Sequence, residues 1–228
     1  MLPSLDIQHI TVEIGTLSLE IELPRDIDQV INYYAEHHAE SADLIPYYAE
    51  LWPSAVALAQ YLLKLPQQLS GKSVIELGCG LGLPSLVAAS RGAQVVATDF
   101  HPHNEQFIRR NIQLNNLTAV TYRTLDWKEP PCNLHGDLIL GSDLLYEARN
   151  IQPLVKCAAA LCATQGSIIL ADPGREHLQS AVLGLREFGF QETLHIVDDI
   201  FIIEFLKTHE KAGSQGHLPA QPCQASSQ

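Results

Sequence analysis

The segment from Val74 to Pro84 constrains the fold of this chain more than any other part of its sequence. It reads Val-Ile-Glu-Leu-Gly-Cys-Gly-Leu-Gly-Leu-Pro, so a short apolar run precedes three glycines at alternate positions. Such an apolar run is typical of a buried strand, and proline suits the first turn of a helix. The segment therefore predicts a strand, a tight glycine loop and a helix in direct succession.

The glycine loop predicts a binding site for a ligand with an anionic group. Backbone N–H groups converge in such a loop, and the absence of Cβ atoms lets a ligand approach them. The loop is formed by Gly78, Gly80 and Gly82, with Glu76 two residues ahead. A dinucleotide-binding fingerprint would have its third glycine at the position of Leu83. The pattern thus points away from NAD and toward S-adenosylmethionine.

The alternation of strand, turn and helix continues beyond this segment. Strands are predicted at residues 73–78, 94–98, 119–124, 137–142 and 167–172, and helices near 83–91, 103–115, 150–163 and 175–188. Short apolar strands separated by helices predict an α/β fold with a parallel sheet that helices cover on both faces. Two strand-like runs, 190–197 and 199–207, have no helix between them and predict an antiparallel hairpin at one edge.

The residues on either side of this repeat have different patterns. Alternating apolar residues over 9–23 predict a β-hairpin, and helical spacing then continues to about residue 40. Pro53 opens a further helix. From His209 onward Gly, Ser, Gln, Pro and Ala dominate, which predicts a disordered tail. The chain is therefore divided into an N-terminal extension (1–44), a main domain (45–208) and a tail (209–228).

The acidic composition narrows the choice of partners. The chain has 26 acidic residues against 14 lysines and arginines, which gives a net charge of −12. Such a field repels phosphate backbones, disfavours direct binding of nucleic acid and favours a basic partner. An acidic surface that serves only solubility is the alternative. The longest apolar stretch, Cys157 to Ala163, is far shorter than the ~20 residues of a membrane-spanning helix, so no membrane association is expected.

The cysteines and histidines predict neither a disulfide framework nor a metal site. The five cysteines form no C-x-x-C pair, and their odd number is typical of reduced thiols. The first residues lack the regions of a signal peptide, so a cytoplasmic location is expected. His101 and His103 are separated by one proline and have no evident third ligand, which favours a solvent-facing turn. The sequence does not indicate an oligomeric state.

Polar residues follow the predicted strands in a regular manner. Asp99 ends the second strand, 17 residues past Gly82, where a carboxylate can accept both hydroxyls of a ribose. Asp126 and Trp127 follow the third strand, where they suit an adenine, and Asp143 follows the fourth. Each acid alone is often a cap or a turn residue. Because ligands of parallel sheets bind beyond the carboxyl ends of the strands, the joint placement predicts a nucleoside-containing ligand.

The stretch from about Ile45 to Arg175 resembles the seven-strand, class I methyltransferases, and specifically the protein lysine methyltransferases with a D-x-x-Y/F motif. Asp143-Leu144-Leu145-Tyr146 matches that motif, and Trp52-Pro53 matches the upstream tryptophan segment of the family. The resemblance implies a Rossmann-like, mostly parallel sheet of seven strands with a reversed edge hairpin. The expected cofactor-binding residues for S-adenosylmethionine are then Trp52, Glu76, Gly78, Gly80, Gly82, Asp99, Asp126, Trp127 and Ser142.

The same resemblance implies methyl transfer to a lysine of a protein substrate. Asp143 and Tyr146 are the expected catalytic residues, since a carboxylate stabilises the developing ammonium and an aromatic ring can contact it. Asp172-Pro173-Gly174-Arg175 is similar to the enzymes that methylate the electron transfer flavoprotein β subunit, which makes Arg175 a candidate substrate-binding residue; an ordinary Pro-Gly turn is the alternative. Methylation of arginine or of a small amine, and a non-catalytic cofactor-binding subunit, remain open.

Overall fold

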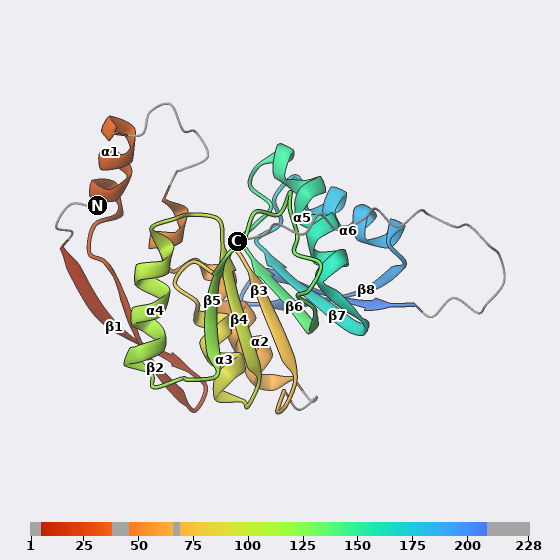
Figure 1. The fold of residues 1–228 in the computed structure, drawn as a ribbon, viewed down its shortest axis with the longest axis horizontal. Helices are drawn as coiled ribbons and strands as arrows, with labels where there is room; N and C mark the ends of the chain where they lie inside the picture. Colours follow the sequence, from red (N-terminus) through yellow and green to blue (C-terminus); the bar gives the residue numbers. More distant parts are fainter. Residues whose placement is uncertain (1–5, 38–45, 66–68, 209–228) are drawn as a thin grey trace.

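The computed structural model describes residues 6–37, 46–65 and 69–208, and its centre is a seven-stranded sheet (Figure 1). The strand order is β5-β4-β3-β6-β7-β9-β8. The first five strands in this order run parallel, and β9 runs antiparallel to both of its neighbours. The predicted Rossmann-like sheet with an antiparallel edge hairpin is confirmed. Its strands are β3 (Ser73–Leu77), β4 (Gln94–Asp99), β5 (Val120–Thr124), β6 (Gly136–Ser142), β7 (Cys162–Asp172), β8 (Phe190–Val197) and β9 (Ile200–Lys207).

Helices cover both faces of the sheet, as parallel strands require. Their bounds are α2 (Pro53–Lys64), α3 (Leu83–Ser90), α4 (Asn104–Leu114), α5 (Ala148–Leu161) and α6 (Leu178–Glu187). The first three share one hydrophobic core, and α5 and α6 form the other (Figure 1). The central strand β3 contributes to both, because successive side chains point to opposite faces. Val74 packs into the first core, and Ile75 and Leu77 pack into the second.

The N-terminal extension packs against α4. Its strands β1 (Ile7–Ile14) and β2 (Leu17–Pro24) form the predicted hairpin, and α1 (Ile27–His37) follows. The side chain of Asn111 on α4 is fully buried and hydrogen-bonded to this hairpin. Its Oδ1 accepts a hydrogen bond from the N–H of Glu22 at 2.7 Å, and its Nδ2 donates to the carbonyl of Leu81 at 3.0 Å. Asn111 thus connects the hairpin to the glycine loop. The proposed boundary at residue 44, the end of the predicted helix near residue 40 and the tail lie outside the described residues.

The junction between α5 and β7 differs from the prediction. The helix ends at Leu161 and the strand begins at Cys162, five residues before the predicted start at 167. Residues 162–166 are Cys-Ala-Thr-Gln-Gly and lack a run of large apolar side chains, so apolar content gave no sign of a strand. Gly166 permits the pairing here, since a Cβ at this position would lie 2.9 Å from the Cys162 sulfur and 3.0 Å from the Asp137 carbonyl oxygen.

The thiols follow the prediction at three positions. Cys79, Cys157 and Cys162 are buried free cysteines. Cys132 is disulfide-bonded, so the prediction of reduced thiols throughout is wrong at this residue. Within the described ranges, no helix is both long and apolar enough to span a bilayer. In the same ranges, no three side chains of His, Cys, Asp or Glu gather in a way that suits a metal ion.

Replacement of Gly82 by alanine should destabilise the fold by more than backbone strain alone. Gly82 has φ +84°, and a Cβ there would lie 2.0 Å from Cδ1 of the buried Ile108. Gly71 has a similar φ of +75° but open space around its Cα. We expect Gly71→Ala to cost ~1–2 kcal/mol from left-handed backbone strain, and Gly82→Ala to cost a further ~1–3 kcal/mol from overpacking. Urea unfolding followed by circular dichroism measures both, and equal costs would contradict the packing argument.

Candidate cofactor and substrate site

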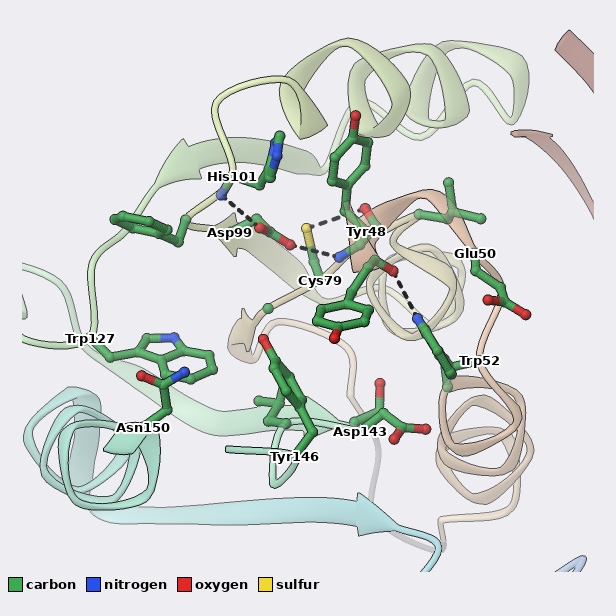
Figure 2. Close-up of a pocket in the computed structure, with 18 of the residues that line it drawn as sticks. Tyr48, Glu50, Trp52, Cys79, Asp99, His101, Trp127, Asp143, Tyr146 and Asn150 are labelled. Atoms are coloured by element: carbon green, nitrogen blue, oxygen red, sulfur yellow. Dashed lines mark hydrogen bonds between the residues drawn. The ribbon is translucent and has the colours of Figure 1, made fainter. Parts of the chain in front are cut away.

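A pocket that is open to solvent lies where β3, β4 and β6 end (Figure 2). These strands are parallel, so their carboxyl ends meet at one edge of the sheet. Residues that are far apart in the sequence therefore line a common cavity. Of the predicted site residues, Trp52, Gly78, Gly80, Gly82, Asp99, Asp126, Trp127, Ser142, Asp143 and Tyr146 all line it.

Glu76 is the predicted cofactor residue that lies outside this lining. It is fully buried on β3, on the side that faces α3. Its Oε2 accepts hydrogen bonds from the N–H of Ser85, at 3.0 Å, and from the Ser85 hydroxyl. Burial raises the pKa of Glu76 to about 8, although these hydrogen bonds act in the opposite direction. The prediction of direct cofactor contact is thus replaced by a structural role, because Glu76 joins the end of β3 to the start of α3.

The glycines of the loop have left-handed backbones, and one of them also lacks room for a side chain. The φ angles of Gly78 and Gly80 are +56° and +49°. A Cβ at Gly78 would lie 2.5 Å from Cδ2 of Leu144, whereas one at Gly80 would lie at an ordinary contact distance of 3.4 Å from the carbonyl oxygen of Tyr48. Glycine is therefore favoured by backbone conformation at both positions and by packing against protein atoms at Gly78. These reasons add to the space for a ligand on which the sequence prediction rested.

Asp99 holds the loop and the following turn together. Its Oδ2 accepts the N–H of Gly80 at 3.0 Å, and its Oδ1 accepts the N–H of His101 at 2.9 Å (Figure 2). Burial raises the pKa of Asp99 above its ordinary value, and the hydrogen bonds from His101 and Gly80 oppose that rise. Each carboxylate oxygen has about two lone-pair sites, so acceptor capacity remains for the hydroxyls of a ligand. His101 is buried and lines the pocket, which corrects the prediction of a solvent-facing turn at this residue.

Three aromatic side chains form a collar at the pocket, defined here as Tyr47, Trp52 and Tyr146. The ring centroid of Tyr47 lies 5.0 Å from that of Tyr146 and 6.2 Å from that of Trp52. The indole N–H of Trp52 donates to the backbone carbonyl of Tyr47 at 2.8 Å, which fixes the loop to the start of α2. Tyr47 and Tyr146 are both exposed. The collar is thus the apolar wall that a ligand entering from solvent meets.

Sequence reasoning did not identify Tyr47 as a site residue. A signal was present, because two adjacent tyrosines lie shortly before the Trp-Pro segment, and aromatic residues in loops are often functional. Other residues of the lining gave no such signal, since their contacts depend on how distant elements pack. The lining residues that the prediction omitted include Tyr47, Tyr48, Glu50, Phe100, His101, Leu144 and Asn150.

Asp143 is held in an unusual backbone conformation beside Arg175. Its φ is +61°, which is uncommon for a residue with a side chain, and it is buried at the end of β6. Its N–H donates to the carbonyl of Ala171 at 2.9 Å, and its Oδ1 accepts a hydrogen bond from Nη2 of Arg175. Such conformations concentrate at functional sites, where the surrounding structure maintains them. Arg175 does not line the pocket and contacts Asp143 instead.

The loop after β7 places Arg175 in this position. Asp172 is fully buried, and its Oδ1 accepts the N–H groups of Gly174, at 2.8 Å, and of Arg175, at 2.6 Å. The guanidinium Nε of Arg175 also lies 3.9 Å from Oδ2 of Asp172. Burial raises the pKa of Asp172, and these N–H groups and the guanidinium lower it. The segment Asp172–Arg175 therefore forms a turn, which was the alternative interpretation of its sequence. This turn also places the guanidinium of Arg175 against Asp143.

Comparison with known proteins identifies the family. The family model described as lysine methyltransferase matches residues 46–185. The chain belongs to this family. The mouse protein N-lysine methyltransferase METTL21A is 34% identical over 152 residues, which cover 62% of this chain and 68% of that relative. The family and the fold together indicate S-adenosylmethionine as the methyl donor.

Two other curated relatives differ in the residue named as their target. The zebrafish electron transfer flavoprotein beta subunit lysine methyltransferase is 34% identical and covers 59% of this chain and 52% of its own length. The mouse histone-arginine methyltransferase METTL23 is 36% identical over 49% of this chain and 46% of its own length. The chain thus spans about half the length of these curated relatives.

Solved structures share the fold of this family member. The T. thermophilus 16S rRNA methyltransferase RsmC, in complex with AdoMet and guanosine, superimposes with a TM-score of 0.64 at 20% identity, over 91% of this chain and 52% of that one. Magnesium protoporphyrin IX methyltransferase from Synechocystis, with bound SAM, gives 0.56 at 17% identity, over 80% and 98%. At 20% and 17% sequence identity, these two structures show that the fold is shared and nothing more.

The residues that line the pocket are suited to the methyl donor. Gly78 lies against the Trp127 side chain, since a Cβ there would be 3.5 Å from Cζ2 of the indole. This contact provides an aromatic surface beside the glycine loop. Asp99, with its remaining acceptor capacity, binds the loop at Gly80 and lines the same pocket. An aromatic face and a carboxylate beside one glycine loop suit the base and the ribose of a nucleoside.

The raised pKa of Glu76 should make stability depend on pH. Its folded-state pKa of about 8 exceeds the ordinary value of 4.5, so the folded state retains a proton that the unfolded state releases. The stability from this group is full below pH ~4.5 and falls as pH rises through 8, by at most ~1.4 kcal/mol per pH unit. In Glu76→Gln this component is absent. Urea unfolding between pH 5 and 9 should therefore show the difference in unfolding free energy between wild type and variant decreasing with pH.

The matched control is Glu105→Gln, which alters an exposed glutamate in a surface ion pair with Arg109. Its difference from wild type should stay nearly constant over the same pH range. A constant difference for Glu76→Gln as well would show that Glu76 is already ionised in the folded protein.

Proposed function

We propose that this chain transfers a methyl group from S-adenosylmethionine to the side-chain amine of a lysine in a protein substrate. One observation carries the proposal: Asp143 and Tyr146 of the D-x-x-Y motif line the same pocket as the glycine loop and Asp99. A pocket that only bound the cofactor would not require a buried acid in a left-handed conformation at its mouth. The named activities of METTL21A and of the electron transfer flavoprotein enzyme support the choice of lysine.

The cofactor would be held by residues from three strand ends. Asp99 would accept hydrogen bonds from the ribose hydroxyls, and Trp127 would pack against the adenine. Asp126 lies beside Trp127 in the lining, where its carboxylate can accept a bond from an exocyclic amine. When bound, the cofactor supplies an electrophilic methyl group on a sulfonium cation. The protein residues bind and orient the two reactants, which is the main source of acceleration in such a displacement.

Asp143 would orient the acceptor amine. Its Oδ1 is engaged by Arg175, so Oδ2 would be the oxygen that accepts a hydrogen bond from the amine. As positive charge builds up on the nitrogen, this carboxylate stabilises it. A free lysine has a pKa of about 10.4, and its transfer from water into the aromatic collar favours the neutral form that attacks.

Tyr146 would contact the substrate lysine through its hydroxyl group and its ring, and would not act as a base. Its ring is partly exposed, but removal of part of the side chain from water raises its pKa to about 12, with further contributions from Glu147 and Asp99. The hydroxyl therefore stays protonated at neutral pH. Its ring, with that of Tyr47, lies where it can contact the methylene chain and the cationic head of a lysine.

The partner and the location are further parts of the proposal. The net charge of −12 supports a protein substrate whose target lysine lies in a basic segment, and it disfavours nucleic acid as the direct partner. We also propose a cytoplasmic location, on the basis of the three buried free thiols, although the disulfide-bonded Cys132 weighs against it. Methylation of arginine is the second candidate, because 36% identity to METTL23 favours it.

Labelled S-adenosylmethionine and a cell lysate test the proposed reaction. We expect a labelled protein band and, by mass spectrometry, methyl groups on lysine.

Asp143→Asn should reduce incorporation of the label by about 100-fold with unchanged cofactor affinity in calorimetry, since it removes the charge and keeps the shape of the side chain. Gly80→Arg should abolish cofactor binding in a folded protein. Methylated arginine would establish the second candidate, and full turnover in Asp143→Asn would refute the role of this carboxylate.

Arg175 should act as a positioning residue for Asp143. We expect Arg175→Gln to lower kcat by about tenfold with little change in the KM for the cofactor, because the carboxylate loses its partner. Arg175→Lys should recover part of the rate, since a single ammonium restores charge but not the planar geometry. The control is Arg109→Gln, which breaks an exposed ion pair on α4. A change in the KM for the cofactor alone, with normal kcat, would contradict this role.

A further inference from the structure

The edge hairpin leaves apolar side chains exposed on one of its two faces. Leu194 and Ile196 of β8 point to the same face and are 55% and 63% exposed. Ile196 is paired across the strands with the half-buried Phe201 of β9. On the opposite face, His195 is covered by Tyr61 of α2, with ring centroids 5.2 Å apart. We name Leu194, Ile196 and Phe201 the hairpin patch.

The hairpin patch lies on a strand edge that is open to pairing. β8 ends the sheet, and among the described strands only β9 pairs with it. Natural edge strands usually carry lysine, proline or a bulge that blocks a further strand. The segment Phe190–Val197 contains neither lysine nor proline, and its pairing with β9 has no register shift. Its outer backbone groups can therefore accept an extended peptide as an added strand.

The hairpin patch is continuous with the proposed catalytic carboxylate. Phe201 is paired with Asp172 at the end of β7. Its ring lies against Gly174, where a Cβ would be only 2.8 Å from Cε2 of the phenyl group. Gly174 precedes Arg175, which is hydrogen-bonded to Asp143. A chain lying along the patch would thus follow the loop after β7 directly to the pocket.

Carboxylates surround this route. Asp198 and Asp199 form the turn between β8 and β9 and are exposed. The side chain of Glu176, in the loop beside Phe201, is 84% exposed. These charges add to the overall excess of acid in the chain. Positive residues of a partner would be attracted here, while its apolar residues would cover Leu194 and Ile196.

We infer that the hairpin patch and the outer edge of β8 form the docking surface for an extended segment of the protein substrate, one in which lysines alternate with apolar residues. The inference rests on the proposed function and specifies its substrate. The apolar side chains of the segment cover Leu194 and Ile196, its lysines face the acids of the β8–β9 turn, and its backbone extends the sheet. A lysine beyond the docked part then reaches the aromatic collar along the loop after β7.

A direct binding experiment tests this inference without requiring catalysis. The probe is a fluorescein-labelled peptide of alternating Val and Lys, and its counterpart has Glu in place of each Lys. By fluorescence polarisation, wild-type protein should bind the Lys peptide and not the Glu peptide. The double variant Leu194→Ser with Ile196→Ser should weaken this binding by about tenfold or more, since centrally buried apolar contacts dominate interfaces. Leu183→Ser, at a 47% exposed leucine on α6, should bind as wild type does.

The charge contribution is tested separately. Asp198→Asn with Asp199→Asn keeps side chains that tolerate the left-handed backbone of this turn, where φ is +49° and +63°. This variant should bind the Lys peptide several-fold more weakly and with a smaller dependence on salt. Equal affinity of wild type and the double serine variant would overturn the inference. So would a wild-type dimer, seen by sedimentation velocity, that the same serine substitutions convert to a monomer.

Calorimetry with S-adenosylmethionine separates this inference from the proposed function. All of these variants should bind the cofactor as wild type does, because none of the altered residues lines the pocket. If wild-type protein failed to bind the cofactor, the proposed function would fail, and the peptide result would still decide whether the hairpin is a docking surface.

Discussion

Two buried carboxyl groups hold the glycine loop from its two sides, and the rest of the pocket is arranged around it. Glu76 binds the first turn of α3 beyond the loop, and Asp99 binds the N–H of Gly80 within it. Both acids lie on neighbouring central strands, so the sheet itself fixes the loop. Buried polar groups without partners are costly, and these hydrogen bonds satisfy both oxygens of Asp99 and Oε2 of Glu76, while Oε1 of Glu76 has no hydrogen-bond partner among the described residues. The loop is therefore tied to the buried strands on one side, while its other side lines the pocket.

The two halves of the sheet divide the proposed chemistry between them. The half with β3 and β4 supplies the groups suited to a nucleoside, and the half with β6, β7 and the reversed hairpin supplies those suited to an acceptor. Asp143 lies at the boundary, where β6 ends beside the loop after β7. Its left-handed backbone is sustained by contacts with Ala171 and Arg175 from that neighbouring strand and loop. Cofactor and acceptor can thus be positioned by different parts of one rigid framework.

The sequence was sufficient for features that depend on local pattern. Strand and helix periods located nearly every element, and Asp99 and Asp143 were found because they directly follow apolar strands. Contacts between distant segments were not predictable in this way. The pairing of Arg175 with Asp143 and the proximity of Tyr47 to Tyr146 depend on strand order and on loop packing. Glu76 was misassigned because its distance from the glycines in sequence says nothing of the face of β3 to which it points.

The buried amide of Asn111 has a consequence for how this chain relates to its family. The family match begins at residue 46, so it includes Asn111 but not the hairpin whose Glu22 backbone satisfies it. Without that hairpin, the amide of Asn111 would lose its partner on Glu22, and the part of α4 that the hairpin covers would be exposed. In this chain the matched region alone is therefore incomplete, because the segment before it completes the hydrogen bonding of a side chain that also binds the glycine loop.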